Sequence, residues 1–266
     1  MGPGWTETVA FAAAWVIAVA ATPAGISGAV LLLPFQVSVL GTPSPAVTPT
    51  NLLYNVVATP GALYRYRRQG QAGGRLAMVL IAGTLPGVIA GSVIRVELLP
   101  GPHVFDLVVG VVLVPLGMWL LLTQPSSAWS GEQAVRRGRV ISSPMLVVLA
   151  MAVGCVGGIY GIGGGSILAP VLIGSRRQAA EVAPAALAST FVTSAAGVVT
   201  FTILAVHEHG AVAPDWPTGL ALGLGGLAGG YTGARLQARL PDALIRRLVG
   251  VLVVAIGARY LWPGLS

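Results

Sequence analysis

The sequence predicts an all-α integral membrane protein with two inverted-topology repeats of about five helical segments each. Three observations support this fold class: an excess of apolar residues, a motif order that recurs in both halves, and opposite placement of arginine in the two halves. Of the 266 residues, 55% are hydrophobic and 9% are charged, whereas a soluble domain carries about 25% charged residues. The polar residues are too few to cover a globule in water, so the expected surrounding is a lipid bilayer.

Long apolar stretches follow one another along the chain, each close to the roughly 20 residues that a helix needs to cross a bilayer. We expect eight such segments, near 6–22, 45–64, 76–95, 104–123, 141–160, 182–206, 216–235 and 243–262. Two shorter stretches lie at 24–40 and 161–174. Both contain glycine and proline, which interrupt helices. We therefore predict broken or re-entrant helices there.

Motifs recur in the same order in the two halves, which indicates two homologous units. GISGAVLLLPF at 25–35 aligns with GIGGGSILAPV at 161–171. PAVTPTNLLYN at 45–55 aligns with PAALASTFVTS at 184–194. The domain prediction is accordingly a first membrane repeat, a cytoplasmic linker and a second, inverted membrane repeat, at 1–124, 125–140 and 141–266.

A second recurrence concerns glycines that are four residues apart. Gly83, Gly87 and Gly91 of the first half correspond to the second-half glycines Gly225, Gly229 and Gly233. Small residues at this spacing let membrane helices approach closely. We expect these glycines to form packing ridges rather than to line a substrate.

Arginine placement predicts that the repeats have opposite orientations. The loop at 65–75 holds four arginines, and its counterpart at 207–215 holds none. The next loop reverses the pattern, with Arg95 alone in the first half and four arginines between 235 and 247 in the second. Arginine-rich loops stay in the cytoplasm, so both termini are predicted to be periplasmic.

The type and placement of the basic residues also indicate the kind of organism and the kinds of partner to expect. All of them are arginine, which together with abundant Ala, Gly and Pro indicates a GC-rich bacterial genome and hence a multi-pass protein of the bacterial inner membrane. The net charge of +7 comes from short loops between apolar segments. We therefore do not predict binding to nucleic acid.

Inverted repeats with paired, glycine- and proline-interrupted short segments are typical of secondary transporters. Irregular backbone survives in a membrane only inside protein or beside a watery cavity, and free N–H groups at a helix N-terminus attract anions. We predict that the glycine stretch is an unwound turn whose N–H groups hold a small anion. The candidate residues are Gly161, Gly163, Gly164, Gly165 and Ser166, with Ser27 and Gly28 in the corresponding place of the first half.

Polar side chains in the following segments form a second candidate layer. They are Asn51, Asn55, Ser189, Thr190 and Ser194. Hydroxyls and amides can donate to the oxygens of an anion without the desolvation cost of a charge. The alternative is ordinary hydrogen bonding between helices. We predict neither a buried arginine, nor a metal, nor a cofactor at this site, and no relay of buried carboxylates.

GIGGGSILAP in the second half and GISGAVLLLPF in the first resemble the TauE/SafE family of bacterial membrane permeases. The resemblance covers nearly the whole chain and includes the basic loop YRYRRQGQAGGR at 64–75. It implies a transporter, not an enzyme, that exports sulfite or an organosulfonate such as sulfoacetate. In one departure, Ser27 and Ala29 stand where the second copy has Gly163 and Gly165, so we expect a less open first turn.

The expected function is export of a small anion by alternating access, and the alternative is a passive channel for a small solute or anion. The residues identify neither a coupling ion, H⁺ or Na⁺, nor the direction of transport, nor the oligomeric state.

Overall fold

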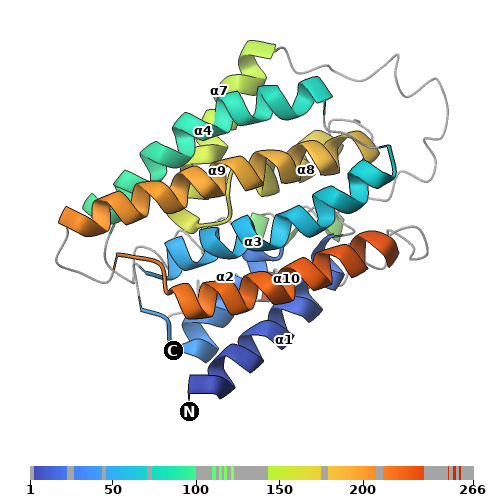
Figure 1. The fold of residues 1–266 in the computed structure, drawn as a ribbon. Coiled ribbons are helices and arrows are strands. Elements are labelled where there is room, and N and C mark those ends of the chain that lie inside the picture. Colours follow the sequence, from blue (N-terminus) through green and yellow to red (C-terminus); the bar gives the residue numbers. More distant parts are fainter. Residues whose placement is uncertain are drawn as a thin grey trace.

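The computed structural model describes residues 3–22, 27–43, 46–70, 74–99, 143–174, 179–207 and 212–236, with isolated helical positions within 110–122 and 251–258. The predicted linker at 125–140 and most of the predicted segments at 104–123 and 243–262 lie outside the described residues. Within the described ranges all regular structure is helical (Figure 1). This confirms the all-α prediction.

The long helices begin and end within a few residues of the predicted segments. They are α1 (Pro3–Ala21), α3 (Val47–Arg68), α4 (Gly74–Glu97), α7 (Ser143–Tyr160), α9 (Ala179–His207) and α10 (Trp216–Leu236). The predicted short segments are α2 (Ala29–Phe35), which the π-helix η2 (Gln36–Leu40) continues, and α8 (Gly165–Gly174). Among the described residues, three stretches are long and apolar enough to cross a membrane: Gly4–Ala21, Gly74–Glu97 and Glu181–His207.

The helices α3 and α9 pack against each other at the centre of the molecule and run in opposite directions (Figure 1). On one side of this pair, α10 packs along both α3 and α1. On the other side, α4 packs along both α9 and α7. The short helix α2 lies against α3, and α8 lies against α9. Every described element is thus close to the central pair or to a helix that flanks it.

Glycine ridges bring the flanking helices into main-chain contact. A Cβ on Gly87 of α4 would collide with the carbonyl oxygen of Met151 and lie 2.8 Å from the amide nitrogen of Cys155, both in α7. A Cβ on Gly229 of α10 would collide with the carbonyl oxygen of Trp15 in α1. The other members of both triplets meet the same two partner helices. The predicted role in helix packing is confirmed.

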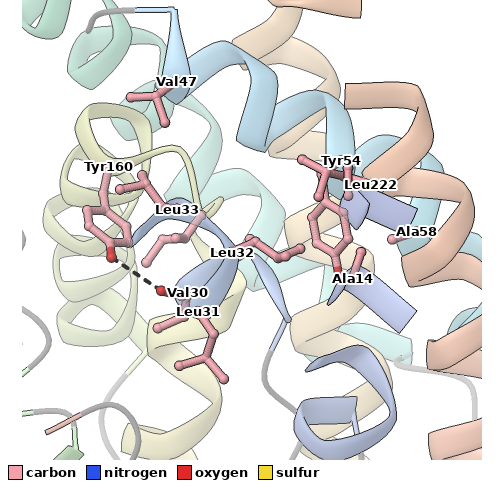
Figure 2. Packing of buried hydrophobic residues seen from close by; sticks show 13 residues of the cluster. Ala14, Val30, Leu31, Leu32, Leu33, Val47, Tyr54, Ala58, Tyr160 and Leu222 are labelled. Atoms are coloured by element: carbon pink, nitrogen blue, oxygen red, sulfur yellow. Dashed lines mark hydrogen bonds between the residues drawn. The ribbon is translucent and has the colours of Figure 1, made fainter. Parts of the chain in front are cut away.

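The apolar cluster around α2 shows how a broken helix is held inside the protein (Figure 2). Leu32 and Leu33 of α2 are fully buried in this cluster, which Tyr54 of α3 and Tyr160 of α7 also line. Pro34 has no N–H, so the carbonyl of Val30 loses its partner within the helix. The Tyr160 hydroxyl donates to that carbonyl over 3.3 Å. A side chain of α7 therefore satisfies the backbone of α2.

Two neighbouring glycines of α10 test the ridge directly. A Cβ on Gly229 would lie 2.9 Å from the Ala18 Cβ besides its collision with Trp15, whereas the nearest atom to a Cβ on Gly230 is 3.5 Å away. We expect Gly229→Ala to lower the stability of the detergent-purified protein by about 1–3 kcal/mol through overpacking. Gly230→Ala should be neutral or stabilise by up to about 1 kcal/mol, because alanine is the better helix former. Equal melting temperatures for the two variants would contradict the ridge.

Candidate functional site

The candidate site centres on the break between α7 and α8. Helix α7 ends at Tyr160, and α8 begins at Gly165. Gly161 and Gly163 have φ angles of +81° and +69°, which are left-handed conformations that glycine adopts without strain. The N–H groups of Gly161 and Ile162 both donate to the carbonyl of Gly157, which closes the end of α7 in the manner of a glycine C-cap. The predicted unwound turn is therefore present.

Hydroxyl groups of α9 surround this turn. The Gly164 N–H donates to Thr193 Oγ1 over 3.3 Å, so in this conformation that amide contacts protein rather than an open cavity. Ser166 Oγ donates to the carbonyl of Ile162 over 3.2 Å and lies 3.3 Å from Thr190 Oγ1. Ser166, Thr190 and Thr193 are all buried. Thr193 and Ser166 thus bond main-chain groups of the break, and Thr190 lies beside Ser166.

The glycines of the turn also make room for their neighbours. A Cβ on Gly163 would lie 2.8 Å from Ser194 Oγ, and a Cβ on Gly164 would lie 2.5 Å from the Thr84 Cβ of α4. A Cβ on Gly165 would collide with the carbonyl of Ala186 and lie 2.7 Å from Thr190 Oγ1. The five predicted residues from Gly161 to Ser166 are thus buried together, Gly161 against α3 and the others against α4 and α9.

The first-half residues form a corresponding polar cluster between α2 and α3. The Ala29 N–H donates to Ser27 Oγ over 3.2 Å, and the Ser27 hydroxyl donates to Asn55 Oδ1. Asn51 Nδ2 donates to the carbonyl of Ala29 over 2.9 Å, and Gln36 Nε2 of η2 donates to Asn51 Oδ1 over 3.1 Å. These side chains hold the start of α2 against α3.

Gly28 differs from the glycines of the second-half turn. Its φ is −57°, an ordinary right-handed value, so Gly28 does not open the backbone as Gly163 does. A Cβ on Gly28 would lie 2.5 Å from the Tyr54 hydroxyl oxygen. The glycine is needed here for close approach to α3. This agrees with the expectation of a less open first turn, although residues 23–26 lie outside the described ranges.

Three fully buried side chains have a donor group without a hydrogen-bond partner within the described residues: Asn55 Nδ2, Ser194 Oγ and Ser92 Oγ of α4. Asn55 and Ser194 are the two that belong to the predicted site. The Asn55 amide turns its oxygen to Ser27. The Ser27 hydroxyl accepts from the Ala29 N–H and donates to Asn55 Oδ1. The Asn55 NH₂ group is then left to donate elsewhere. An unpaired buried polar group costs about 1–3 kcal/mol.

Asn55 and Ser194 lie at the same level of the α3–α9 crossing. A Cβ on Gly197 of α9 would lie 2.7 Å from Leu52 Cδ1 of α3, which fixes the contact between the two helices. The helices run in opposite directions (Figure 1). Asn55, three residues after Leu52, and Ser194, three residues before Gly197, therefore lie at the same height along the helix pair. Both positions are near the middle of their helices.

The structure brings the predicted residues together in two groups. The α8–α9 group contains Gly161, Gly163, Gly164, Gly165, Ser166, Ser189, Thr190 and Ser194, and the α2–α3 group contains Ser27, Gly28, Asn51 and Asn55. Ser189 Oγ lies 2.8 Å from Thr84 Oγ1, so this hydroxyl bonds a neighbouring helix. The sequence analysis missed Gln36, Thr84 and Thr193. Each is a polar residue inside an apolar segment, which is the signal that could have identified it.

Arg95 corrects the expectation that no arginine is buried. It was expected in a short outer loop, but it lies within α4 and is fully buried. Arg95 Nε donates to Thr48 Oγ1 over 3.4 Å, and Nη1 donates to the carbonyl of Leu99. An arginine at the end of an apolar segment can point to water or turn inward, and only the packing of α3 and α7 decides which. In the described ranges, no three His, Cys, Asp or Glu side chains gather as metal ligands would.

The left-handed turn can be tested with a matched pair of glycines. Gly161 and Gly70 both have positive φ, but a Cβ on Gly161 would lie 2.5 Å from the carbonyl oxygen of Thr48, whereas a Cβ on Gly70 would meet nothing within 4 Å. We expect Gly70→Ala to lower the free energy of unfolding by about 1–2 kcal/mol, the penalty of the left-handed backbone alone. Gly161→Ala should cost clearly more in the same thermal-unfolding assay. A smaller loss for Gly161→Ala than for Gly70→Ala would contradict the enclosed turn.

Comparison with known proteins identifies the family. Residues 10–260 match the family described as "Sulfite exporter TauE/SafE". A "Probable membrane transporter protein" of Xylella fastidiosa (strain 9a5c) is 27% identical over 242 residues, which cover 90% of this chain and 88% of that protein. The "Probable membrane transporter protein YunE" of Bacillus subtilis (strain 168) is 29% identical over 120 residues, 45% of this chain and 41% of that protein.

No solved structure matches the chain. The family match, by contrast, spans almost the whole sequence and agrees with the apolar, membrane-length helices. The chain therefore belongs to the TauE/SafE sulfite exporter family, a family of membrane transporters rather than enzymes.

Proposed function

We propose that the protein is a secondary transporter that exports sulfite or a small organosulfonate across the inner membrane by alternating access between two inverted repeats. The observation that carries this proposal is the pair of unpartnered buried donors, Asn55 Nδ2 and Ser194 Oγ, at the middle of the α3–α9 crossing. A small oxyanion offers the acceptor oxygens that both groups lack.

The packing of the helices supports the division into repeats at 1–124 and 141–266. Helix α1 lies against α10, and α7 lies against α4. If the two proposed repeats exchange places, α1 corresponds to α7 and α10 to α4, so the α1–α10 contact becomes the α7–α4 contact. The α3–α10 contact likewise becomes the α9–α4 contact. Helices α3 and α9 exchange places with each other, and they are antiparallel (Figure 1). Inverted repeats related by a two-fold axis in the membrane plane produce this pattern.

The polar contacts repeat in the same way. The alignment of the two halves pairs Asn55 with Ser194. Each lies beside the residue two positions before its own short helix: Ser27 next to Asn55, and Gly163 next to Ser194. A substrate between α3 and α9 would thus meet one donor from each repeat. Transporters commonly place substrate at such a repeat interface, near the bilayer midplane.

The burial of the site suggests how transport proceeds. The turn residues and both donors are enclosed by protein, so this conformation corresponds to an occluded state. Release to either side requires the α3–α9 contact to open, which rocking of one repeat against the other would accomplish. Neutral donors hold an anion without a strong ion pair, which favours release.

The orientation in the membrane follows from the arginines. Helices α3 and α10 run in the same direction (Figure 1), and both carry arginine in their last turn. By the positive-inside rule this end faces the cytoplasm. Helix α1 begins at the opposite end of the molecule (Figure 1), so we propose that the N-terminus is periplasmic. An inverted second repeat would put the C-terminus on the same side.

Reconstituted flux tests the transport mechanism. We expect sulfite efflux from proteoliposomes to saturate, and to be accelerated by sulfite on the opposite side, because a carrier returns faster when loaded. Flux that rises linearly with sulfite concentration, without acceleration from the opposite side, would support the passive channel instead. A wild-type protein that moves neither sulfite nor sulfoacetate would contradict the proposed substrate class.

Removing one donor tests the binding site. Ser194→Ala should reduce kcat/KM for sulfite by about tenfold, which corresponds to about 1.4 kcal/mol. Because the deleted hydroxyl has no partner among the described residues, stability should stay unchanged or rise slightly. The matched control is Thr202→Val on the same helix, whose hydroxyl bonds only the carbonyl of Val198 among the described contacts. Loss of stability in Ser194→Ala with unaltered flux would refute the site.

A further inference from the structure

Gln36 carries a buried acceptor atom that no described group uses. Among the described residues, the fully buried side chains with an unpartnered polar atom are Gln36, Asn55, Ser92 and Ser194. The unpartnered atoms of the last three can donate, whereas Gln36 Oε1 can only accept. Leaving a buried acceptor unpaired costs about 1–3 kcal/mol. The donors proposed to hold the anion leave this acceptor without a role.

The hydrogen bonds of Asn51 determine which atom of the Gln36 amide is left over. Asn51 Nδ2 donates to the carbonyl of Ala29 over 2.9 Å, and a carbonyl oxygen can only accept. Asn51 Oδ1 is therefore the atom that faces Gln36, and it lies 3.1 Å from Gln36 Nε2. Only the nitrogen of the Gln36 amide can donate to that oxygen. The Gln36 oxygen is thus the atom without a partner.

Gln36 lies close to the proposed central donors. Its amide bonds Asn51, which is one helical turn from Asn55 on α3, and residues four apart share one face of a helix. One turn of helix rises about 5.4 Å. Each hydrogen bond of a small oxyanion spans about 2.5–3.2 Å. The spacing therefore allows one anion to contact both the Asn55 donor and the Gln36 acceptor.

The segment that carries Gln36 is irregular and packs near the glycine turn. Gln36 begins the π-helix η2, directly after the proline-containing helix α2. Such π-helical turns are rare and frequently occur at functional sites. Val37 and Leu40 of η2 pack against the apolar cluster that also contains Ile162, a residue of the α7–α8 break. The segment thus bonds α3 and shares a cluster with the second-half turn.

The second repeat has no equivalent acceptor. In the alignment that pairs Pro34 with Pro170, Gln36 corresponds to Leu172, which is fully buried in an apolar cluster. The two proposed repeats therefore offer one donor each, and the first repeat adds an acceptor. An anion that satisfies all three atoms needs one oxygen that donates, besides the oxygens that accept.

We propose that the site takes the singly protonated anion, hydrogen sulfite with its proton on oxygen, and that Gln36 Oε1 accepts the hydrogen of this hydroxyl group. The unprotonated oxygens accept from Asn55 Nδ2 and Ser194 Oγ. Fully deprotonated sulfite would turn a negative oxygen toward the Gln36 oxygen and would bring two charges into a buried site, where unpaired charge is costly. This inference rests on the proposed transport function and adds to it a specificity-determining residue.

Methanesulfonate provides a matched probe, because it has the charge and shape of hydrogen sulfite but a methyl group in place of the hydroxyl. The measurement is the anion concentration that gives half of the maximal rise in melting temperature of the purified protein, in mildly acidic buffer where most sulfite is singly protonated. We expect the wild-type value to be at least about tenfold lower for hydrogen sulfite, since a site built around a substrate hydroxyl rejects analogues without it. Equal values, as expected if Gln36 Oε1 bonds only water, would overturn the proposal.

Gln36→Leu, which installs the residue of the second repeat, tests the acceptor itself. We expect it to raise the half-saturating concentration of hydrogen sulfite about tenfold and to change that of methanesulfonate less than about twofold, so that the preference is lost. Gln36→Met, which keeps the length of the side chain, replaces it if Gln36→Leu does not fold. The matched control is Gln69→Leu at the exposed end of α3, which should keep the preference. A lowered melting temperature with an unchanged preference would reduce Gln36 to a packing residue and refute its role.

Three further outcomes separate this inference from the proposed function. If Ser194→Ala weakens the binding of both anions while Gln36→Leu keeps the preference, only the role of Gln36 fails. If the wild-type protein prefers hydrogen sulfite through Gln36 but transports neither anion, the transport function fails and the binding preference stands. A wild-type protein whose melting temperature responds to neither anion would contradict both.

Discussion

Main-chain N–H and C=O groups in the interior of a bilayer have no water to bond, so a helix can break there only where other protein groups replace the lost partners. The structure meets this constraint at both broken segments. Thr193 accepts from the Gly164 N–H, and Tyr160 donates to the carbonyl that Pro34 leaves unpaired. Each break is therefore hydrogen-bonded to a neighbouring helix, which requires a polar side chain of that helix to face the break.

Glycine serves this arrangement in two physically different ways. In the turn, Gly161 and Gly163 adopt backbone angles that other residues avoid. Along α4 and α10, glycines such as Gly87 and Gly229 instead remove side chains, so that neighbouring helices touch through their main chains. The second role supports the first, because closely packed outer helices enclose the central pair. Within this enclosure, Asn55 and Ser194 keep donors that no described protein group uses.

Much of the fold could be predicted from the sequence because its causes are local. Hydropathy and length determine the spans, and the crowding of glycines before Pro170 marks the break. From the sequence, hydroxyls that have a hydrogen-bond partner could not be distinguished from hydroxyls that have none. Ser189 meets Thr84 of a different helix, whereas Ser194 meets no partner among the described residues, and this depends on the register between α4 and α9. The inward turn of Arg95 likewise depends on where Thr48 and the end of α7 lie.

The central claim is that an oxyanion binds at the middle of the crossing between two antiparallel helices. Its most direct test is an experimental structure of the protein with selenite, a heavier analogue of sulfite whose selenium can be located by anomalous scattering. We expect a selenium peak within hydrogen-bonding reach of Asn55 Nδ2 and Ser194 Oγ, through the oxygens that it carries. A selenium peak confined to the surface arginines, with both donors bonded to protein side chains, would contradict the claim.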